Sequence, residues 1–153
     1  MLKLHSDALE STVLEEMDSH DLACTLKQFL MELPTPLITP ELHRRFLALS
    51  SIGDEVRLRD DYLRCLVKSL PVPHTAVLVY VCNMLATCAR HAEGTRMDVT
   101  NVGIVFAPVF MRSAESDMLS DALKCSEVVS LLVQKVNLLH DLVRTLKCML
   151  PLC

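Results

Sequence analysis

Residues 18–38 read DSHDLACTLKQFLMELPTPLI, and this stretch says most about the fold. Asp18 or Ser19 can cap the start of a helix, because either side chain can accept a hydrogen bond from a first-turn N–H group. Apolar side chains then recur at the spacing of one helix face, at Leu22, Leu26, Phe29, Leu30 and Leu33. The helix ends at Pro34-Thr35-Pro36, since proline disfavours the helical conformation in the residue before it. We therefore predict an amphipathic helix followed by an extended turn.

The rest of the chain is also predicted to be mostly helical. Further segments with apolar residues at helical spacing predict helices over residues 39–49, 58–70, 74–91, 98–109 and 123–146. Thr39 and Asp98 are good N-caps, and Pro108 should kink or end the helix that Asp98 opens. The helix over 74–91 is apolar nearly all round, which is typical of the buried centre of a bundle. Between these helices we expect loops at residues 92–97 and 112–121, and before the first of them a weak helix at residues 9–17.

Composition supports an all-α fold, a single bundle of about six helices over residues 1–153. The chain has 3 Gly, 4% aromatic residues and no Trp, a mix that favours packed helices over a sandwich or barrel. Its most apolar run, residues 76–89, is interrupted by Asn83 and is shorter than the roughly 20 residues that span a bilayer, so we expect no transmembrane segment. A net charge of −4 argues against nucleic acid as the main partner.

The cysteines indicate a reducing compartment. There are 7, an odd number, and they are scattered through apolar helical positions, which is typical of reduced thiols in the cytoplasm. No signal peptide pattern opens the chain. Cys82, Cys88 and His91 stand at helical spacing, but the two thiols fall on different sides of a helix and no C-x-x-C pair occurs. We therefore expect structural thiols and no metal site.

Two segments together resemble one known family. Residues 18–38 are similar to the D-x-H-x-V-A-x-L-L-K-x-F-L-R-E-L-P-x-P-L helix of RhoGAP domains, and residues 96–108, RMDVTNVGIVFAP, to the family's N-K-M-T-x-x-N-L-A-x-V-F-G-P. Leu70-Pro71 with His74 matches the L-P-x-x-N before the family's central helix. Long motifs in the right order rarely coincide, and this resemblance covers about residues 18–145. It implies a RhoGAP-like bundle that binds a GTP-loaded Rho-family small GTPase in signal transduction. Such a domain stimulates GTP hydrolysis as an activator, not as an enzyme in its own right, and needs no cofactor.

The resemblance implies a GTPase-binding surface at Lys27, Met31, Arg96 and Asn101. Lys27 would meet acidic or carbonyl groups near the switch regions of the GTPase, although a solvated lysine is the ordinary alternative. Met31 stands where the family has Arg, and a thioether cannot donate a hydrogen bond. Arg96 would be a docking charge on an exposed loop or, less readily, a substitute for the family's arginine finger. Asn101 would support catalysis by holding the partner's backbone near its catalytic glutamine, unless it only satisfies a first-turn N–H.

The arginine finger itself is the main departure. In this family it lies in a G-I-[FY]-R-x-x-G loop well before the first motif, and the 153 residues contain no such sequence. We therefore expect a domain that is N-terminally truncated relative to the family and weak or inactive alone, since a finger contributes roughly 10³–10⁵ in rate. A catalytically inactive pseudo-GAP that serves as a protein-interaction module is the alternative. A helical scaffold that has lost the site is a third hypothesis.

Overall fold

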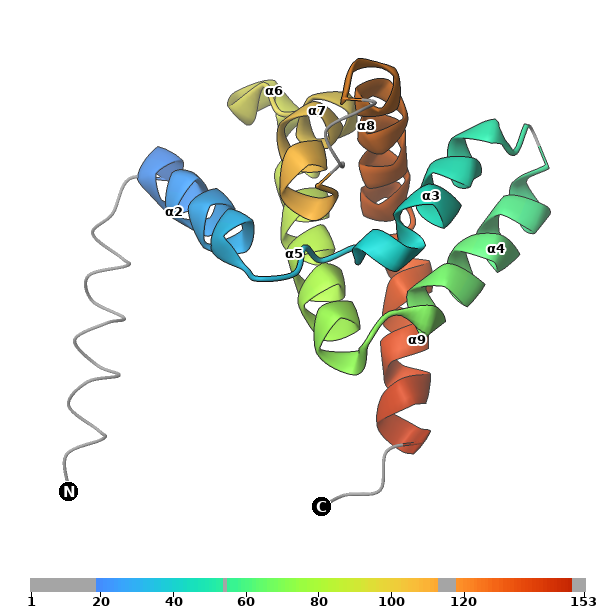
Figure 1. Ribbon diagram of the computed structural model, residues 1–153. Helices are drawn as coiled ribbons and strands as arrows, with labels where there is room; N and C mark the ends of the chain where they lie inside the picture. The colour runs from blue at the N-terminus through green and yellow to red at the C-terminus, as the bar shows by residue number, and fades with distance from the viewer. Residues whose placement is uncertain (1–18, 54, 113–117, 150–153) are drawn as a thin grey trace, which may run out of the picture. The chain divides into compact units, whose positions relative to one another are not determined.

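The computed structural model describes residues 19–53, 55–112 and 118–149. The chain divides into two compact units, residues 1–33 and 34–153, which are considered separately. Within the described ranges the elements are eight α-helices and one 3₁₀ turn, with no strand (Figure 1). The all-α fold class predicted from the sequence is therefore confirmed.

The first unit contains α2 (Ser19–Glu32), which begins and ends where the capping residues and prolines predict. Its side-chain amide at Gln28 donates to Glu32 Oε1 at 2.9 Å, an i, i+4 pair on the helix surface. Leu30 is buried, whereas Phe29, which the sequence pattern puts on the same apolar face, is 59% exposed. The weak helix expected at 9–17 falls outside the described residues.

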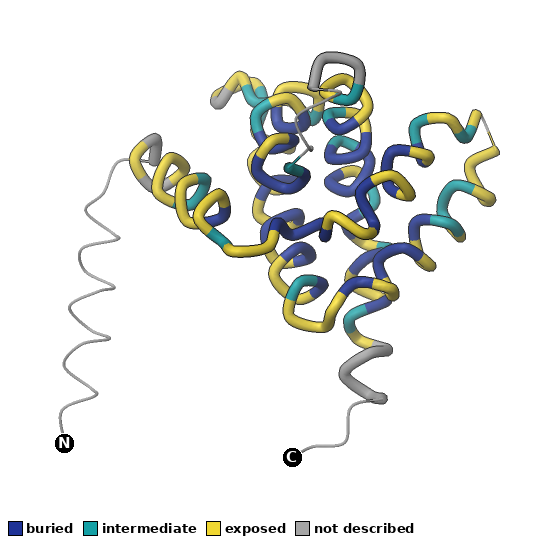
Figure 2. Tube along the Cα trace, in the orientation of Figure 1, coloured by how far each residue is buried: buried dark blue, intermediate teal, exposed yellow. Residues whose placement is uncertain are grey.

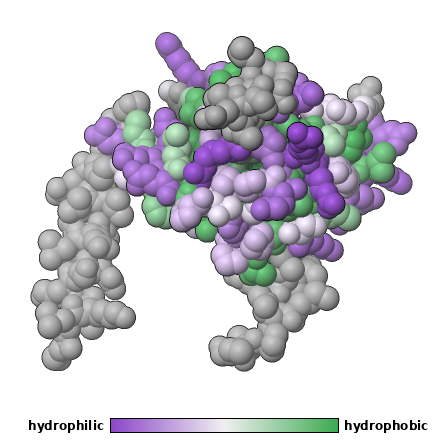
Figure 3. Space-filling model, viewed as in Figure 1, coloured by the Kyte–Doolittle hydropathy of each residue, from purple (hydrophilic) through white to green (hydrophobic). Residues whose placement is uncertain are grey.

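The second unit contains the other elements, in the order α3 (Pro40–Leu47), η1 (Ala48–Ser51), α4 (Val56–Ser69), α5 (Val72–Arg90), α6 (Ala92–Thr95), α7 (Val99–Phe110), α8 (Met118–Gln134) and α9 (Val136–Met149). α7 packs along α8, α5 contacts α7, α8 and α9, and α3 contacts α4 and α8. Buried residues line the sides of these helices that face one another (Figure 2). The largest fully buried side chains of this unit include Phe46, Phe110, Leu49, Leu63, Leu78, Leu132 and Leu139. On the face drawn in Figure 3, hydrophilic and apolar side chains of this unit alternate in small groups.

The short segment after α2 is fixed within the second unit. The Ile38 N–H donates to the Phe110 carbonyl at the end of α7, at 3.0 Å. The Leu37 carbonyl accepts a hydrogen bond from His74 Nδ1 in the first turn of α5, at 3.2 Å. Thr39 and Pro40 then open α3 as predicted, with Pro40 at the first helical position. The end of the first sequence motif is thus tied to the start of the central helix and to the end of the second motif.

The central helix α5 is only partly buried, so the expectation of burial all round is wrong. Leu78, Cys82 and Leu85 are buried among its neighbours, but Tyr80 is 77% exposed and Met84 also reaches the surface. The neighbouring helices cover one side of α5, and the sequence pattern does not reveal which side. By length and hydropathy α5 is also the one helix among the described residues that could cross a membrane, a test that the core helices of soluble proteins also pass.

The contact between α7 and α8 is very close at Gly103. A Cβ atom at this position would lie 2.6 Å from the Ser126 carbonyl oxygen and would overlap Ser130 Oγ. The Ser130 hydroxyl in turn donates to the Val99 carbonyl in the first turn of α7, at 3.1 Å. Only glycine at position 103 lets the two helices approach this closely.

Three boundaries differ from those predicted. Residues 92–95 form the short helix α6 instead of a loop, and α8 starts at Met118, inside the loop expected at 112–121. The single helix predicted over 123–146 is broken at Lys135, whose Nζ pairs with Asp60 of α4 at 2.9 Å. Pro108 lies within α7, which ends two residues later at Phe110. Packing between helices can override local propensity, so propensity alone does not place boundaries of this kind.

Candidate functional site

The first turn of α7 carries the residues of the second motif. Asp98 has an extended backbone and caps the helix, and its carboxylate accepts from the Asn101 N–H at 2.7 Å. A carboxylate is favourable here because the helix N-terminus carries partial positive charge and free N–H groups. The predicted cap is therefore confirmed, and it fixes the position of Asn101 in the turn.

Arg96 stands just before this turn in a strained conformation. Its φ of 55° and ψ of 19° are left-handed, and no other non-glycine in the described ranges has a positive φ. Such a conformation costs a side-chain-bearing residue roughly 1–2 kcal/mol. Two hydrogen bonds hold it: the Arg96 N–H donates to the Ala92 carbonyl at 2.7 Å, and Asn101 Nδ2 donates to the Arg96 carbonyl at 3.0 Å. The structure thus brings Arg96 and Asn101 into direct contact.

Asn101 therefore has a structural role that the sequence does not predict. Its side chain donates to a carbonyl, whereas the alternative expected from the sequence was that it accepts from a first-turn N–H. The side chain is exposed, and among the described residues its Oδ1 accepts no hydrogen bond. The second amide hydrogen and this oxygen are available to a partner while the bond to Arg96 stays intact.

An apolar strip continues from Asn101 along the exposed side of α7. Ile104 is 59% exposed, and Pro108 is exposed as well. Positions 101, 104 and 108 lie at i, i+3 and i+7, so they share one face of the helix. The sequence analysis missed Ile104, although this spacing from Asn101 was the signal that could have found it.

Lys27 and Met31 lie on α2, in the first unit. They are four residues apart and so lie on one stripe of that helix. Lys27 is half-buried, and Met31 is 51% exposed. Arg96 and Asn101 belong to the second unit, so the structure describes the two pairs separately. The roles of all four residues remain predictions.

The remaining chemically reactive side chains of the second unit include buried thiols and one buried histidine. Burial raises the pKa of the Cys82 thiol well above its usual range, so Cys82 stays protonated. Within the described ranges no three His, Cys, Asp or Glu side chains are grouped to hold a metal ion. His43 of α3 is buried, and neither of its ring nitrogens has a hydrogen-bond partner there. Burial lowers the pKa of His43, the nearby Asp121 carboxylate raises it and Arg44 lowers it further.

Comparison with known proteins defines the family. The profile of the RhoGAP domain matches residues 2–115, and the chain belongs to this family. It is 30% identical over 140 residues to Rho GTPase-activating protein gacN of Dictyostelium discoideum, covering 90% of this chain and 23% of that protein. It is 35% identical over 120 residues to Rho GTPase-activating protein 27 of Homo sapiens, covering 77% of this chain and 13% of that protein. The chain thus spans less than a quarter of the length of these relatives.

Solved structures show the same fold. The BH domain from Graf, the GTPase regulator associated with focal adhesion kinase, superposes with a TM-score of 0.76 at 25% identity, covering 82% of this chain and 68% of that one. Human Rho GTPase activating protein 15 gives a TM-score of 0.70 at 23% identity, over 74% of this chain and 55% of that one. The resemblance stated from the two sequence motifs is therefore confirmed.

Proposed function

We propose that this chain binds a Rho-family small GTPase in its GTP-bound state and regulates GTP hydrolysis by that GTPase. The carrying observation is the family match over residues 2–115, which includes all four residues predicted for the binding surface. Relatives named as Rho GTPase-activating proteins support it. In this role the chain is an activator, because the phosphate bond of GTP is broken in the active site of the GTPase. The interpretation of the 7 cysteines as reduced thiols supports a cytoplasmic location.

The arrangement before and within α7 supports docking at this surface. The Arg96 guanidinium is exposed and forms no ion pair among the described residues, so it can meet an acidic or carbonyl group of the partner. Asn101 offers its Oδ1 and second amide hydrogen, and the exposed Ile104 adds apolar contact area. Lys27 and Met31 would add a charge and an adaptable apolar contact on α2.

We expect these 153 residues to bind the GTPase but to accelerate its GTP hydrolysis only weakly. Only interactions that are stronger in the transition state raise the chemical rate. The sequence contains no G-I-[FY]-R-x-x-G motif, and the finger in that motif supplies roughly 10³–10⁵ in rate. Asn101 could still order the catalytic glutamine, which would give weak acceleration.

Binding and single-turnover hydrolysis test this proposal. The chain should bind a Rho-type GTPase loaded with a non-hydrolysable GTP analogue more tightly than the GDP form. Arg96→Ala and Asn101→Ala should weaken that binding, whereas Arg64→Ala, an exposed arginine on α4, should leave it unchanged. Equal affinity for both nucleotide states, or equal effects of all three substitutions, would contradict the proposal. Fusing a family-like segment with its arginine should increase the hydrolysis rate at least about a hundredfold.

A second candidate is a binding module that does not accelerate hydrolysis. Met31 favours it, because this position carries Arg in the family motif and a thioether donates no hydrogen bond. Under this hypothesis the GTPase still binds, but the fused arginine segment leaves hydrolysis at its intrinsic rate. Met31→Arg in the fused protein should then restore part of the acceleration.

A further inference from the structure

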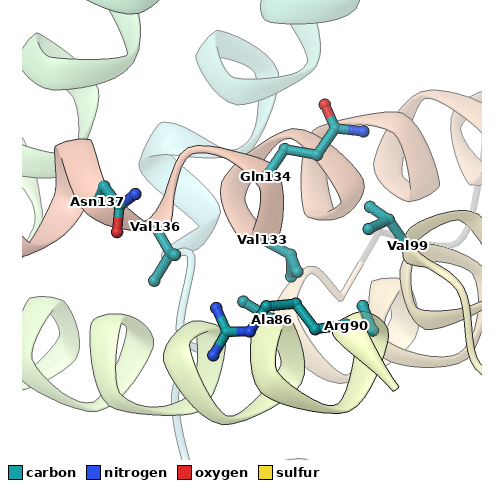
Figure 4. Close-up of a pocket in the computed structure, with 8 residues that line it drawn as sticks. Ala86, Arg90, Val99, Val133, Gln134, Val136 and Asn137 are labelled. Carbon is teal, nitrogen blue, oxygen red and sulfur yellow. The ribbon is translucent and has the colours of Figure 1, made fainter. Parts of the chain in front are cut away.

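A cavity of about 240 Å³ opens within the second unit where α8 gives way to α9 (Figure 4). Its walls come from the last turns of α5 and α8 and from the first turns of α7 and α9. The break at Lys135 separates α8 from α9 at this point, and the small side chains Ala86 and Ala89 leave the space between the helices unfilled. The cavity thus lies beside the helix break, and none of its lining residues is among those of the GTPase-binding surface proposed above.

The inner part of the cavity is apolar. Val133 and Val136 are buried at its base, and Ala86 opposite them is buried as well. These side chains are already shielded from water, so an apolar group that fills this space would gain mainly van der Waals contact with them. The base therefore suits a short aliphatic chain.

The rim is polar and has unused hydrogen-bonding groups. Arg90 extends toward the start of α9 in Figure 4, and its Nη2 donates to Thr87 Oγ1 at 2.9 Å, which restrains the guanidinium. No carboxylate among the described residues pairs with Arg90. The side-chain amides of Gln134 and Asn137 also line the cavity and form no hydrogen bond within the described ranges. One positive charge and two amides thus surround an apolar base.

We propose that this cavity binds a small amphipathic carboxylate. The carboxylate would take a charge-assisted, two-pronged pair of hydrogen bonds from Arg90 and further donors from Gln134 or Asn137. Its short aliphatic chain would lie against Val133 and Ala86. The volume is below the range of about 300–1,000 Å³ that is usual for drug-sized ligands, so a chain the size of hexanoate fits better than a large one. This site is independent of the GTPase proposal, and either can fail without the other.

Titration of the full 153-residue chain with sodium hexanoate, followed by ¹H–¹⁵N NMR, tests the site. Hexanoate should shift the backbone amides of Ala86, Val99 and Val133, and neutral hexanamide should bind at least tenfold more weakly. Arg90→Gln should weaken hexanoate binding at least tenfold. Arg64→Gln on α4 is the matched control and should leave the binding unchanged. Arg90→Lys, which keeps the charge without the planar fork, should give an intermediate loss.

The same experiment can overturn the proposal in three ways. Equal binding of hexanoate and hexanamide would mean that the rim does not recognise a carboxylate. Undiminished binding in Arg90→Gln, or in Ala89→Leu, which should fill the cavity, would place the ligand elsewhere. A short acidic peptide, acetyl-Leu-Glu-Leu-amide, that binds tenfold more tightly than hexanoate would replace the small carboxylate with a protein segment as the occupant. Circular dichroism of each variant checks that the chain is folded, and the Arg90→Lys result decides if Arg90→Gln does not fold.

Discussion

Replacement of Gly103 by alanine probes the contact between α7 and α8. In an exposed helix the change from glycine to alanine stabilises by about 1 kcal/mol, because alanine restricts the unfolded chain. Here the added Cβ would lie 2.6 Å from the Ser126 carbonyl oxygen and would overlap Ser130 Oγ. The carbonyl belongs to the backbone of α8 and cannot rotate away. The Ser130 hydroxyl can rotate, but it then gives up its hydrogen bond to the Val99 carbonyl.

These terms give the size of the effect. Overpacking in a core costs about 1–3 kcal/mol, and a lost hydrogen bond of this kind adds about 0.5–1.5 kcal/mol. Against these stands the gain of about 1 kcal/mol from the helix and the unfolded chain. Gly103→Ala should therefore lower the free energy of unfolding by about 2 kcal/mol. For a chain of this size that corresponds to a fall in Tm of about 4–8 °C.

Urea unfolding monitored by circular dichroism measures this change, with Gly94→Ala as the matched control. A Cβ at Gly94, on α6, meets nothing within 4 Å, so that variant should be as stable as the wild type or slightly more stable. Gly103→Ala combined with Ser130→Ala should lose less than the sum of the two single changes, because one of the two clashes is then relieved. If Gly103→Ala proves as stable as Gly94→Ala, the close approach of α7 and α8 described above is incorrect.

Three further substitutions follow from the structure. Asp98→Ala should cost about 1 kcal/mol of stability, because the Asn101 N–H loses its cap, and urea unfolding against wild type measures this. Lys135→Met should cost about 1–2 kcal/mol, since it leaves a partly buried Asp60 carboxylate unpaired, and adding Asp60→Asn should recover part of that loss. Burial lowers the pKa of His43 below 6.5, so the unfolded chain binds the proton more readily; stability is full above about pH 6.5 and falls as the pH drops below it. The urea midpoint should therefore fall less between about pH 7.5 and pH 5.5 in His43→Leu than in wild type, and equal slopes would contradict this account.

The sequence predicted the features that short-range chemistry determines. The Asp98 cap, the Pro40 start of α3 and the end of α2 before Pro34 all depend on neighbours within a few residues, and each was found where it was expected. The two long motifs also identified the family before any fold was known. Local signals of this kind are strong because one turn of chain contains the whole interaction.

Features set by distant parts of the chain were not predictable. The ion pair between Lys135 and Asp60 joins residues 75 apart in the sequence, and the helical pattern that continues across Lys135 gives no sign of the break between α8 and α9. Tyr80 looked like a core residue because α5 is apolar nearly all round, yet its side chain is 77% exposed. A left-handed backbone conformation is usually signalled in the sequence by glycine or asparagine, but position 96 is an arginine. The hydrogen bond from Asn101 to the Arg96 carbonyl helps to hold this conformation. Arg96 and Asn101 are two of the four residues predicted for the binding surface, but only the structure shows that they are in contact.

The hydrogen bond from Asn101 to the Arg96 carbonyl also affects the entropy cost of binding a partner at the first turn of α7. An asparagine side chain that is free in solution must give up rotamer freedom when a partner immobilises it, at a cost of about 0.5–1.5 kcal/mol. In this chain Asn101 Nδ2 is already held at 3.0 Å, so most of that freedom is lost during folding. The exposed oxygen therefore presents one orientation to an approaching molecule. Residue 101 is preorganised, and a partner that accepts this orientation gains affinity without having to order the side chain.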